Sequence, residues 1–422
     1  MINDKWYPLD NAAQIFPMIS KKKDTNSFRL SAVLKEKVDN ILLEEATRLA
    51  LMRYQTFKVR LKKGVFWYYL EYNDKEVIVR EEDPYFTESN DYKKQNDYLF
   101  NITYYGKRIS IEIFHALSDG GGGLEFFKTI LYHYLLLKGV EIKNEGEILT
   151  KEVEELLDES QDSFKYNYKS KTNKIDKENS AYKIKGAVHK HKWVDCIQAI
   201  MDVDDLINKC KEYSCTITEF ITALITYNIY YTYYLFDNSN KAIKLFVPVN
   251  ARKYFKSKTL RNFALFIRTN SIYNGDIKLI DVINDVKETF NFELSKERMY
   301  ARIKSNIKLE KNFFVRFMIL PIKTLIVKLF FKLLGTDSNT FSFSNLGKVE
   351  MPYEMANHID RLEFANGASL DARINAALIT FNNKAVLTFS SVLIDRSLQA
   401  NIISMLQKEG IRLVICTNDL EV

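Results

Sequence analysis

The sequence predicts an α+β fold arranged as two lobes, and three observations support this prediction. Strand-like and helix-like segments alternate irregularly along the 422 residues, without the regular βαβ rhythm of a Rossmann fold or a barrel. Hydrophobic residues make up 46% of the chain and charged residues 27%, which is typical of a folded protein with a large core. Between residues 158 and 185 apolar periodicity is lost, as expected of a segment that connects two lobes. We therefore expect an N-terminal lobe over residues 1–165, a crossover linker over 166–190 and a C-terminal lobe over 191–422.

The first lobe is predicted to mix strands and helices. A strand over Phe28–Leu34 precedes an amphipathic helix for which Asp39 is a suitable N-cap,. Residues 57–70 alternate as a β-hairpin, and Gly64 is expected to supply a positive φ at its turn,. The remaining predicted elements are strands over Tyr98–Tyr105 and Arg108–Phe114, joined at Gly106, and a helical pattern from Leu124 that stops at Gly139,.

The second lobe is predicted to contain more strands than the first. Its expected strands are Trp193–Met201, Ile243–Val249, Leu265–Ile272, Thr340–Ser344, Leu362–Ala365, Ile374–Phe381, Ala385–Leu393 and Ile411–Cys416,. Its expected helices are Val203–Tyr213, Ile217–Leu235 and one that begins near Arg396,. Asn382 and Asn383 mark a tight turn between two of the strands,.

Charge and cysteine content exclude several classes of function. Lys and Arg number 61 against 54 Asp and Glu, a net charge of +7 that is small for this length, so we expect no nucleic-acid partner,. Four cysteines without C-x-x-C spacing indicate reduced thiols rather than a zinc ribbon or a redox pair,. The first residues show no basic segment followed by an apolar run, which favours a cytoplasmic protein without a signal peptide,.

The most apolar stretch, residues 313–334, is interrupted by Arg, Pro and three Lys residues. A membrane-spanning helix tolerates such charges poorly, so we do not expect one here. Two interpretations stay open. The stretch could form a helix packed on the second lobe with snorkelling lysines, or it could make peripheral contact with a membrane surface.

The sharpest feature of the sequence is the segment Ile111–Gly123. A predicted strand leads directly into His115, and Asp119 follows four residues later, immediately before a run of four glycines. A histidine at the end of a strand points into any cleft that the strand borders, and the glycines let a ligand or a neighbouring backbone approach closely. A phosphate loop is excluded because no Gly-Lys-Ser/Thr sequence follows,.

The segment His115-Ala-Leu-Ser-Asp119-Gly120 resembles the H-x-x-x-D-G motif of coenzyme A-dependent acyltransferases, a superfamily that includes chloramphenicol acetyltransferase, condensation domains and alcohol acetyltransferases. Three further segments, in the expected order, resemble those of bacterial alcohol acetyltransferase-like proteins. They are Val247-Pro-Val-Asn-Ala-Arg252, Lys258-Thr-Leu-Arg-Asn-Phe263 and Phe341-Ser-Phe-Ser-Asn-Leu-Gly347. The resemblance spans nearly the whole chain. One departure is Phe114, which replaces the first histidine of the doubled histidine in many members.

The resemblance implies two similar chloramphenicol acetyltransferase-like lobes with an active-site tunnel between them. His115 would be the general base that removes a proton from an alcohol or amine as it attacks an acyl thioester. Direct attack requires no acyl-enzyme. In the family, the motif Asp pairs with an arginine and holds the loop, so Asp119 and Arg252 are expected to be structural, with Arg261 as the competing partner. The alternative is that Asp119 orients the imidazole of His115, as the acid of a catalytic triad does.

Other site residues are predicted with alternatives. Ser344 is the candidate donor to the oxyanion of the tetrahedral intermediate, with Ser342 and Asn345 as rivals. Gly120, Gly121 and Asn345 are expected to contact substrate. The remaining histidines have simpler interpretations: a packing role for His133, solvated charge for His189 and His191, and a loop position for His358. We expect no metal and no cofactor beyond acyl-CoA as co-substrate.

The sequence thus favours transfer of an acetyl group from coenzyme A to a small-molecule alcohol or amine. Two alternatives are a condensation-type enzyme that takes its acyl group from a carrier protein, and a non-catalytic two-lobed binding protein. The acceptor, the acyl chain length and the choice between monomer and homodimer depend on the shape of surfaces that form only in the folded protein.

Overall fold

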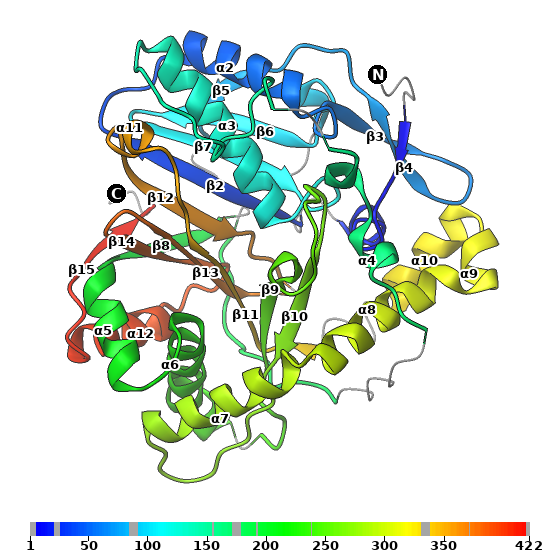
Figure 1. Cartoon of the computed structure of the whole chain (residues 1–422). Helices are drawn as coiled ribbons and strands as arrows, with labels where there is room; N and C mark the ends of the chain where they lie inside the picture. The colour runs from blue at the N-terminus through cyan, green and yellow to red at the C-terminus, as the bar shows by residue number, and fades with distance from the viewer. Residues whose placement is uncertain are drawn as a thin grey trace.

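The computed structural model describes residues 6–20, 26–83, 92–153, 156–170, 179–190, 193–237, 239–330, 338–370 and 372–418. These residues form two lobes that each combine a sheet with helices, the first lying above the second in Figure 1. The predicted α+β class is therefore confirmed.

A five-stranded sheet forms the centre of the first lobe. Its order is β12 (Ile359–Asn366), β2 (Ser27–Leu34), β7 (Arg108–Phe114), β6 (Phe100–Tyr105) and β5 (Val79–Glu81). Helices α2 (Asn40–Arg53) and α3 (Gly120–Leu137) pack against each other beside this sheet (Figure 1). As predicted, Asp39 caps α2, because its carboxylate accepts hydrogen bonds from the backbone N–H groups of Ile41 and Leu42,.

A seven-stranded sheet forms the centre of the second lobe. Its order is β10 (Ala264–Arg268), β9 (Leu245–Asn250), β11 (Phe341–Lys348), β13 (Ile374–Phe381), β14 (Lys384–Ser391), β8 (Asp195–Asp202) and β15 (Leu413–Thr417). One face packs under α5 (Val203–Glu212), α6 (Ile217–Thr232), α7 (Leu279–Glu293) and α12 (Ser397–Lys408). The period of two along β13 divides its side chains between two cores. Ala376 and Leu378 face the helices, whereas Ala377 and Ile379 face the first lobe.

The two halves of the chain are interleaved. Strand β12, from the second half, pairs antiparallel with β2, so that Leu362 lies opposite Ala32. The sheet of the first lobe therefore takes one strand from within residues 191–422. The described end of the crossover segment lies along the second lobe, since the backbone N–H of Tyr182 donates to the carbonyl of Ala242 and Val188 forms a β-bridge with Leu393.

The predicted hairpin is present, but its glycine acts differently from the prediction. Strands β3 (Val59–Lys63) and β4 (Tyr68–Tyr72) pair, and β1 (Trp6–Pro8) adds a third strand. Gly64 is not among the positive-φ glycines. Its backbone N–H donates to the carbonyl of Trp67, and a Cβ on Gly64 would lie 2.7 Å from that oxygen. Lack of space, rather than a left-handed backbone, therefore requires glycine at this turn.

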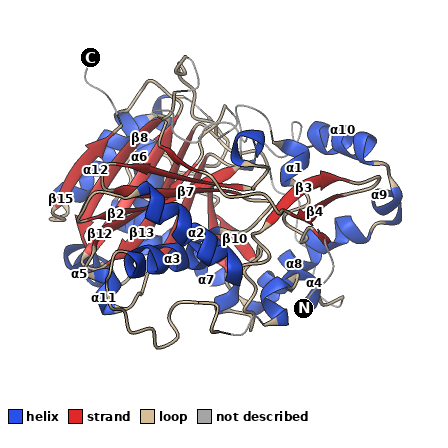
Figure 2. Cartoon of the chain, turned by 90° about the horizontal axis from the view of Figure 1, so that it is seen from above, coloured by secondary structure: helices blue, strands red, loops and turns tan. Residues whose placement is uncertain are grey.

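The apolar stretch after residue 313 lies against the first lobe, not on the second. It follows α8 (Lys296–Lys311) and forms α9 (Phe313–Phe317) and α10 (Leu320–Phe330); residues 331–334 lie outside the described residues. Figure 2 shows α9 and α10 beside the β3–β4 hairpin at one end of the molecule. The backbone N–H of Leu320 donates to the carbonyl of Val65 in that hairpin. Within the described ranges, no helix is long and apolar enough to cross a membrane.

The remaining elements are short. They are α1 (Phe16–Ile19), α4 (Ser163–Tyr166), α11 (Tyr353–Ala356) and the 3₁₀ turns η1 (Tyr92–Gln95), η2 (Leu157–Ser160), η3 (Tyr234–Phe236) and η4 (Ala251–Lys253). Of these, α1 and η4 contribute to the site described below.

Candidate active site

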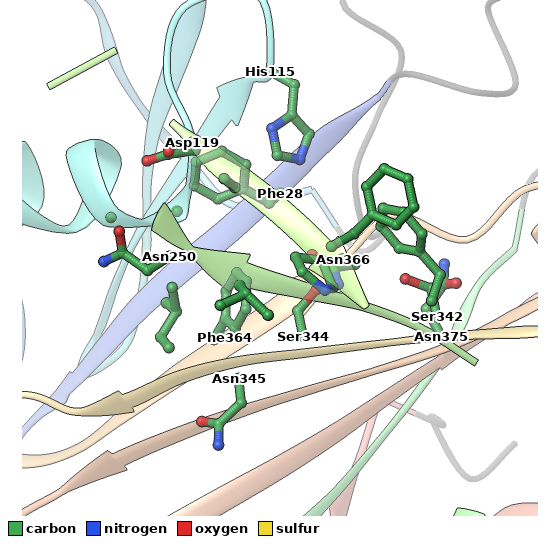
Figure 3. Close-up of a pocket in the computed structure, with 18 of the residues that line it drawn as sticks. Phe28, His115, Asp119, Asn250, Ser342, Ser344, Asn345, Phe364, Asn366 and Asn375 are labelled. Atoms are coloured by element: carbon green, nitrogen blue, oxygen red, sulfur yellow. The ribbon is translucent and has the colours of Figure 1, made fainter. Parts of the chain in front are cut away.

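A cavity of about 1640 Å³ lies between the lobes. The first lobe contributes Phe28 and His115 to its lining, and the second contributes Ser344 (Figure 3). The parallel strands β9 and β11 pair only at one end, around Leu245 and Phe341. Beyond that point both strands line the cavity, together with Thr218 of α6. Residues from both faces of the seven-stranded sheet therefore border one continuous space.

His115 follows the last residue of β7 and is held at its backbone on both sides. Its N–H donates to the carbonyl of Asn26 (3.0 Å), and its carbonyl accepts from the side-chain amide of Asn262 (2.9 Å). The imidazole stacks on Phe16 of α1, with ring centroids 5.1 Å apart, and contacts Phe28 at 4.9 Å. Figure 3 shows the ring pointing into the cavity, toward the side where Ser344 and Asn366 lie.

Burial controls the charge of this imidazole. Desolvation lowers the pKa of His115 to about 4, and the nearby Asp119 carboxylate and Ser118 backbone only partly oppose this shift,. The ring is therefore neutral at neutral pH. A neutral imidazole has a free lone pair and can accept a proton from a group in the cavity.

Asp119 is buried, and its carboxylate has three partners. Oδ1 accepts from the backbone N–H of Gly122 (3.0 Å) and so caps α3. Oδ2 accepts from the backbone N–H of Phe263 (2.7 Å) and from Nη1 of Arg252 (2.9 Å). Burial alone would raise the pKa of Asp119, but the charge of Arg252 and these hydrogen bonds hold it below its ordinary value,.

Arg252 ties this carboxylate to the loop that connects β9 and β10. Besides Asp119, its guanidinium donates to the carbonyls of Thr259 and Arg261. The competing candidate, Arg261, lies elsewhere: its guanidinium donates to the carbonyl of Pro8 and lies 3.7 Å from Asp10. The partner of Asp119 is therefore Arg252.

The cavity is lined by polar residues of β11 that include Ser342, Ser344 and Asn345, and the side chain of Asn345 is held differently from the serines. Ser342 and Ser344 both line the cavity, and Nδ2 of Asn366 donates to Oγ of Ser344 (2.9 Å). In Figure 3 the side chain of Asn345 points away from His115. Its amide donates to Oγ1 of Thr218 and its carbonyl accepts from the N–H of Gly347. These internal bonds occupy both ends of the Asn345 amide, whereas the Ser344 hydroxyl donates no hydrogen bond to any described residue.

Comparison of the sequence with models of protein families assigns the chain to a family. The model of the alcohol acetyltransferase family matches residues 153–409, more than half of the chain. The chain belongs to the alcohol acetyltransferase family. Membership makes the protein an acyltransferase and confirms the resemblance inferred from the motifs, although the His115 segment precedes the matched residues. A comparison with curated proteins found no match.

Solved structures show the same fold. Polyketide synthase associated protein 5 from Mycobacterium tuberculosis superimposes with a TM-score of 0.63 at 11% identity, covering 94% of this chain and 96% of its own. Trichothecene 15-O-acetyltransferase from Fusarium sporotrichioides has a TM-score of 0.54 at 11% identity, with coverages of 96% and 94%. Wax ester synthase/diacylglycerol acyltransferase from Marinobacter aquaeolei VT8 has a TM-score of 0.54 at 11% identity, with coverages of 96% and 100%. The two-lobed fold of this family member is thereby confirmed.

Several residues at this site were not predicted from the sequence. Phe16 and Phe28 pack on the imidazole, Asn262 holds its carbonyl, and Asn366 orients Ser344. Asn262 lies within the quoted Thr-Leu-Arg-Asn-Phe segment, so a signal for it existed. The other three lie on separate elements, each far from His115 in sequence, and no local pattern connects them with it.

Of the other histidines in the described residues, only His189 lines the cavity. His133 is buried on α3. His189 is not the solvated charge that was expected, because its Nε2 lies 3.0 Å from Oδ2 of the buried Asp195, which Arg396 also binds. His191 lies outside the described residues. Among the described residues, no cluster of His, Cys, Asp or Glu could hold a metal ion.

The first three glycines of the run line the cavity but are closely packed by protein atoms. A Cβ on Gly121 would lie 3.2 Å from Nη1 of Arg252, and one on Gly120 would lie 2.8 Å from a methyl group of Leu346. At Gly122 the Cβ would lie only 2.0 Å from the carbonyl oxygen of Leu260. The helix therefore begins at Gly120, four residues before the predicted Leu124, because glycines let it dock against the second lobe,.

Gly122→Ala is expected to lower the free energy of unfolding by about 3 kcal/mol, because the Leu260 backbone cannot move away without breaking the docked loop,. Gly120→Ala is the matched control and should be nearly neutral, since the Leu346 methyl group can shift and alanine favours a helix,. Chemical denaturation of both variants measures the difference. Equal stability of the two variants would contradict the close approach at Gly122.

Proposed function

We propose that this acyltransferase moves an acetyl group from coenzyme A to an alcohol or an amine, with His115 as the general base. The observation that carries the proposal is a neutral imidazole that points into a cavity bordered by both lobes. The cavity volume of about 1640 Å³ exceeds the roughly 300–1,000 Å³ of an ordinary ligand pocket. It therefore has room for the thioester arm of a donor together with a small acceptor.

In the proposed reaction, His115 accepts the proton of the acceptor O–H or N–H as the heteroatom attacks the thioester carbonyl carbon. A bond forms between the heteroatom and this carbon, and the carbonyl electrons move to oxygen. The tetrahedral intermediate then collapses, the C–S bond breaks, and the departing thiolate takes the proton from the His115 imidazolium. The products are the acetylated acceptor and free coenzyme A, and no acyl-enzyme is required.

Ser344 is the proposed donor to the oxyanion. Its Oγ already accepts a hydrogen bond from Asn366, so the hydroxyl proton is directed elsewhere. A pre-oriented donor stabilises the developing negative charge without a cost of reorganisation. Asp119 and Arg252 have a structural role in the proposal, because their bonds hold the loop that carries Asn262 and hence the backbone of His115.

Thiol release tests the proposed function. Purified protein is incubated with acetyl-CoA and a panel of short alcohols and amines, and free thiol is measured colorimetrically. The proposal expects release above the buffer rate that depends on the acceptor. The same panel is repeated with acetyl groups carried on a phosphopantetheinylated carrier protein. If thiol is released only from the acetylated carrier protein, the donor is the carrier protein and not coenzyme A. If neither donor supports thiol release, the proposal is overturned.

The pH profile of kcat/KM is expected to have an unusually low acid limb. Protonated His115 cannot accept a proton, so activity should fall as pH decreases through the pKa of about 4 in the free enzyme. The ordinary histidine value of about 6.5 would place this limb at much higher pH. Initial rates between neutral pH and the onset of acid unfolding measure the limb. A limb near the ordinary histidine pKa would contradict the desolvation of His115.

A further inference from the structure

An exposed apolar surface covers one end of the first lobe, outside the cavity described above. Its members are 40–78% exposed and come from α9, α10, the link between these helices and the turn of the β3–β4 hairpin. They are Val65, Phe66, Phe313, Phe314, Phe317, Ile319, Ile322, Leu325, Ile326 and Leu329. We call this set the α9–α10 surface. Both views show the two helices and the hairpin together at the edge of the molecule (Figures 1 and 2).

The orientation of α10 is fixed with its apolar side outward. On the inner side, Leu320 is buried and its N–H donates to the carbonyl of Val65. Lys323 is also buried: its ammonium group donates to the carbonyl of Phe66 (2.8 Å) and lies over the ring of Trp67. A surface helix ordinarily buries its apolar side chains and exposes its lysines. Here the lysine anchors the helix, and the apolar residues face solvent.

The segments that form this surface contain basic residues and no acidic residues. Residues 311–330 contain four basic and no acidic residues, and residues 56–70 likewise contain four basic and no acidic residues. Together they carry +8, while the whole chain carries +7, so the rest of the chain has a net charge of −1. Two acidic residues border these segments, and both are paired: Glu71 with Arg60 and Lys62, and Glu310 with Lys165. Arg316 and Lys328 remain exposed beside the apolar side chains.

We propose that the α9–α10 surface binds the surface of an anionic lipid bilayer. Aromatic and aliphatic side chains would enter the boundary between headgroups and acyl chains, while Lys and Arg contact the anionic headgroups. Charge complementarity selects this occupant over a second copy of the chain, because a dimer through this surface would bring two strongly positive ends together. The many exposed apolar side chains select a lipid over a nucleic acid, whose backbone would leave them in water.

The proposal does not rest on the proposed catalytic function. No residue of the α9–α10 surface is among the described residues that line the cavity. Membrane binding and thiol release can therefore fail separately. In a functional context, binding would place this acyltransferase where lipid-soluble acceptors are concentrated.

Vesicle flotation tests the proposal with the full chain. One set of vesicles is phosphatidylcholine alone, and the other is a mixture of phosphatidylcholine and phosphatidylglycerol. The wild type should float with the anionic vesicles, and raised ionic strength should weaken this binding. Phe314→Ser/Leu325→Ser removes two members of the surface that are 78% and 61% exposed, so folding should be unaffected. The partition coefficient of this variant should fall at least about tenfold.

A matched control is Ile41→Ser/Phe236→Ser, which removes two side chains that are 75% and 77% exposed elsewhere on the protein. This control should bind vesicles like the wild type, and far-UV circular dichroism should be the same for all three proteins. The proposal is overturned if the wild type binds neither kind of vesicle, if it binds neutral and anionic vesicles equally, or if both double variants lose binding alike. Concentration-dependent dimerisation that only Phe314→Ser/Leu325→Ser abolishes, without vesicle binding, would also overturn it.

Discussion

His115→Ala is expected to lower kcat for thiol release by about 10²–10⁴-fold, the range over which positioned acid–base groups contribute to catalysis. The alanine cannot accept the proton of the acceptor, so attack on the thioester would produce a high-energy charged intermediate. The acceptor still enters the cavity, because the variant widens it between Phe16 and Phe28. KM should therefore change much less than kcat, and steady-state kinetics with saturating acetyl-CoA measure both.

The matched control is His358→Ala, which removes a histidine that does not line the cavity. Its activity should equal that of the wild type. His115→Ala should retain cooperative melting, because the backbone bonds from His115 to Asn26 and Asn262 do not involve the side chain. Unchanged kcat in His115→Ala would exclude His115 as the base, whichever donor the enzyme uses. Loss of cooperative melting would instead identify a structural role.

The elements predicted best are those whose local pattern and tertiary environment agree. The residues of β13 are buried along the whole strand, and its predicted bounds, Ile374–Phe381, equal the observed ones. The turn after it is also as predicted, with Asn382 at φ 50°,. By contrast, the pairing of β12 with β2 joins residues far apart in the chain. Local periodicity carries no information on such pairing, because it depends on which edges remain open once both lobes have formed.

The predicted packing of α10 on the second lobe was wrong, again because local periodicity does not show which surface a helix contacts. A pattern of apolar residues with spaced lysines predicts apolar packing and exposed lysines, but the structure has Lys323 inside and Leu325 outside. Helices α7 and α8 were not predicted, although Val282, Val286 and Phe290 follow a helical period in α7. That signal was available in the sequence. In α8 the predominance of charged residues concealed the shorter apolar series.

The site could be predicted where a short motif brings residues together by itself. His115 and Asp119 lie in one turn, so their proximity follows from sequence spacing. The choice between Arg252 and Arg261 could not be made in this way, because both lie in the β9–β10 loop and only the fold decides which guanidinium faces Asp119. From the sequence, the glycines after Asp119 could have contacted either a ligand or the protein. In the structure, the close approach of Arg252 to Gly121 and of Leu260 to Gly122 shows contact with the protein.

Breaking the Asp119–Arg252 pair is expected to lower the free energy of unfolding by about 3–5 kcal/mol, together with activity. Arg252→Ala leaves a buried carboxylate without its charged partner, which is the costly way to disrupt a buried ion pair,. Asp119→Ala removes in addition the cap of α3 and the acceptor for the N–H of Phe263. Asn262, which precedes Phe263 in this loop, donates a hydrogen bond to the carbonyl of His115. A loosened loop would therefore also displace the His115 imidazole. Urea denaturation and initial rates measure the two effects.

A double-mutant cycle separates this pair from general surface effects. The double variant Asp119→Ala/Arg252→Ala should be destabilised by less than the sum of the single variants, because the second substitution removes a group that has already lost its partner. Arg48→Ala, which breaks the exposed pair with Glu45, is the control and should cost at most about 1 kcal/mol,. Additive single effects would contradict a direct interaction between Asp119 and Arg252. Lost activity with unchanged stability would contradict the structural role, and would favour a direct action of Asp119 on His115.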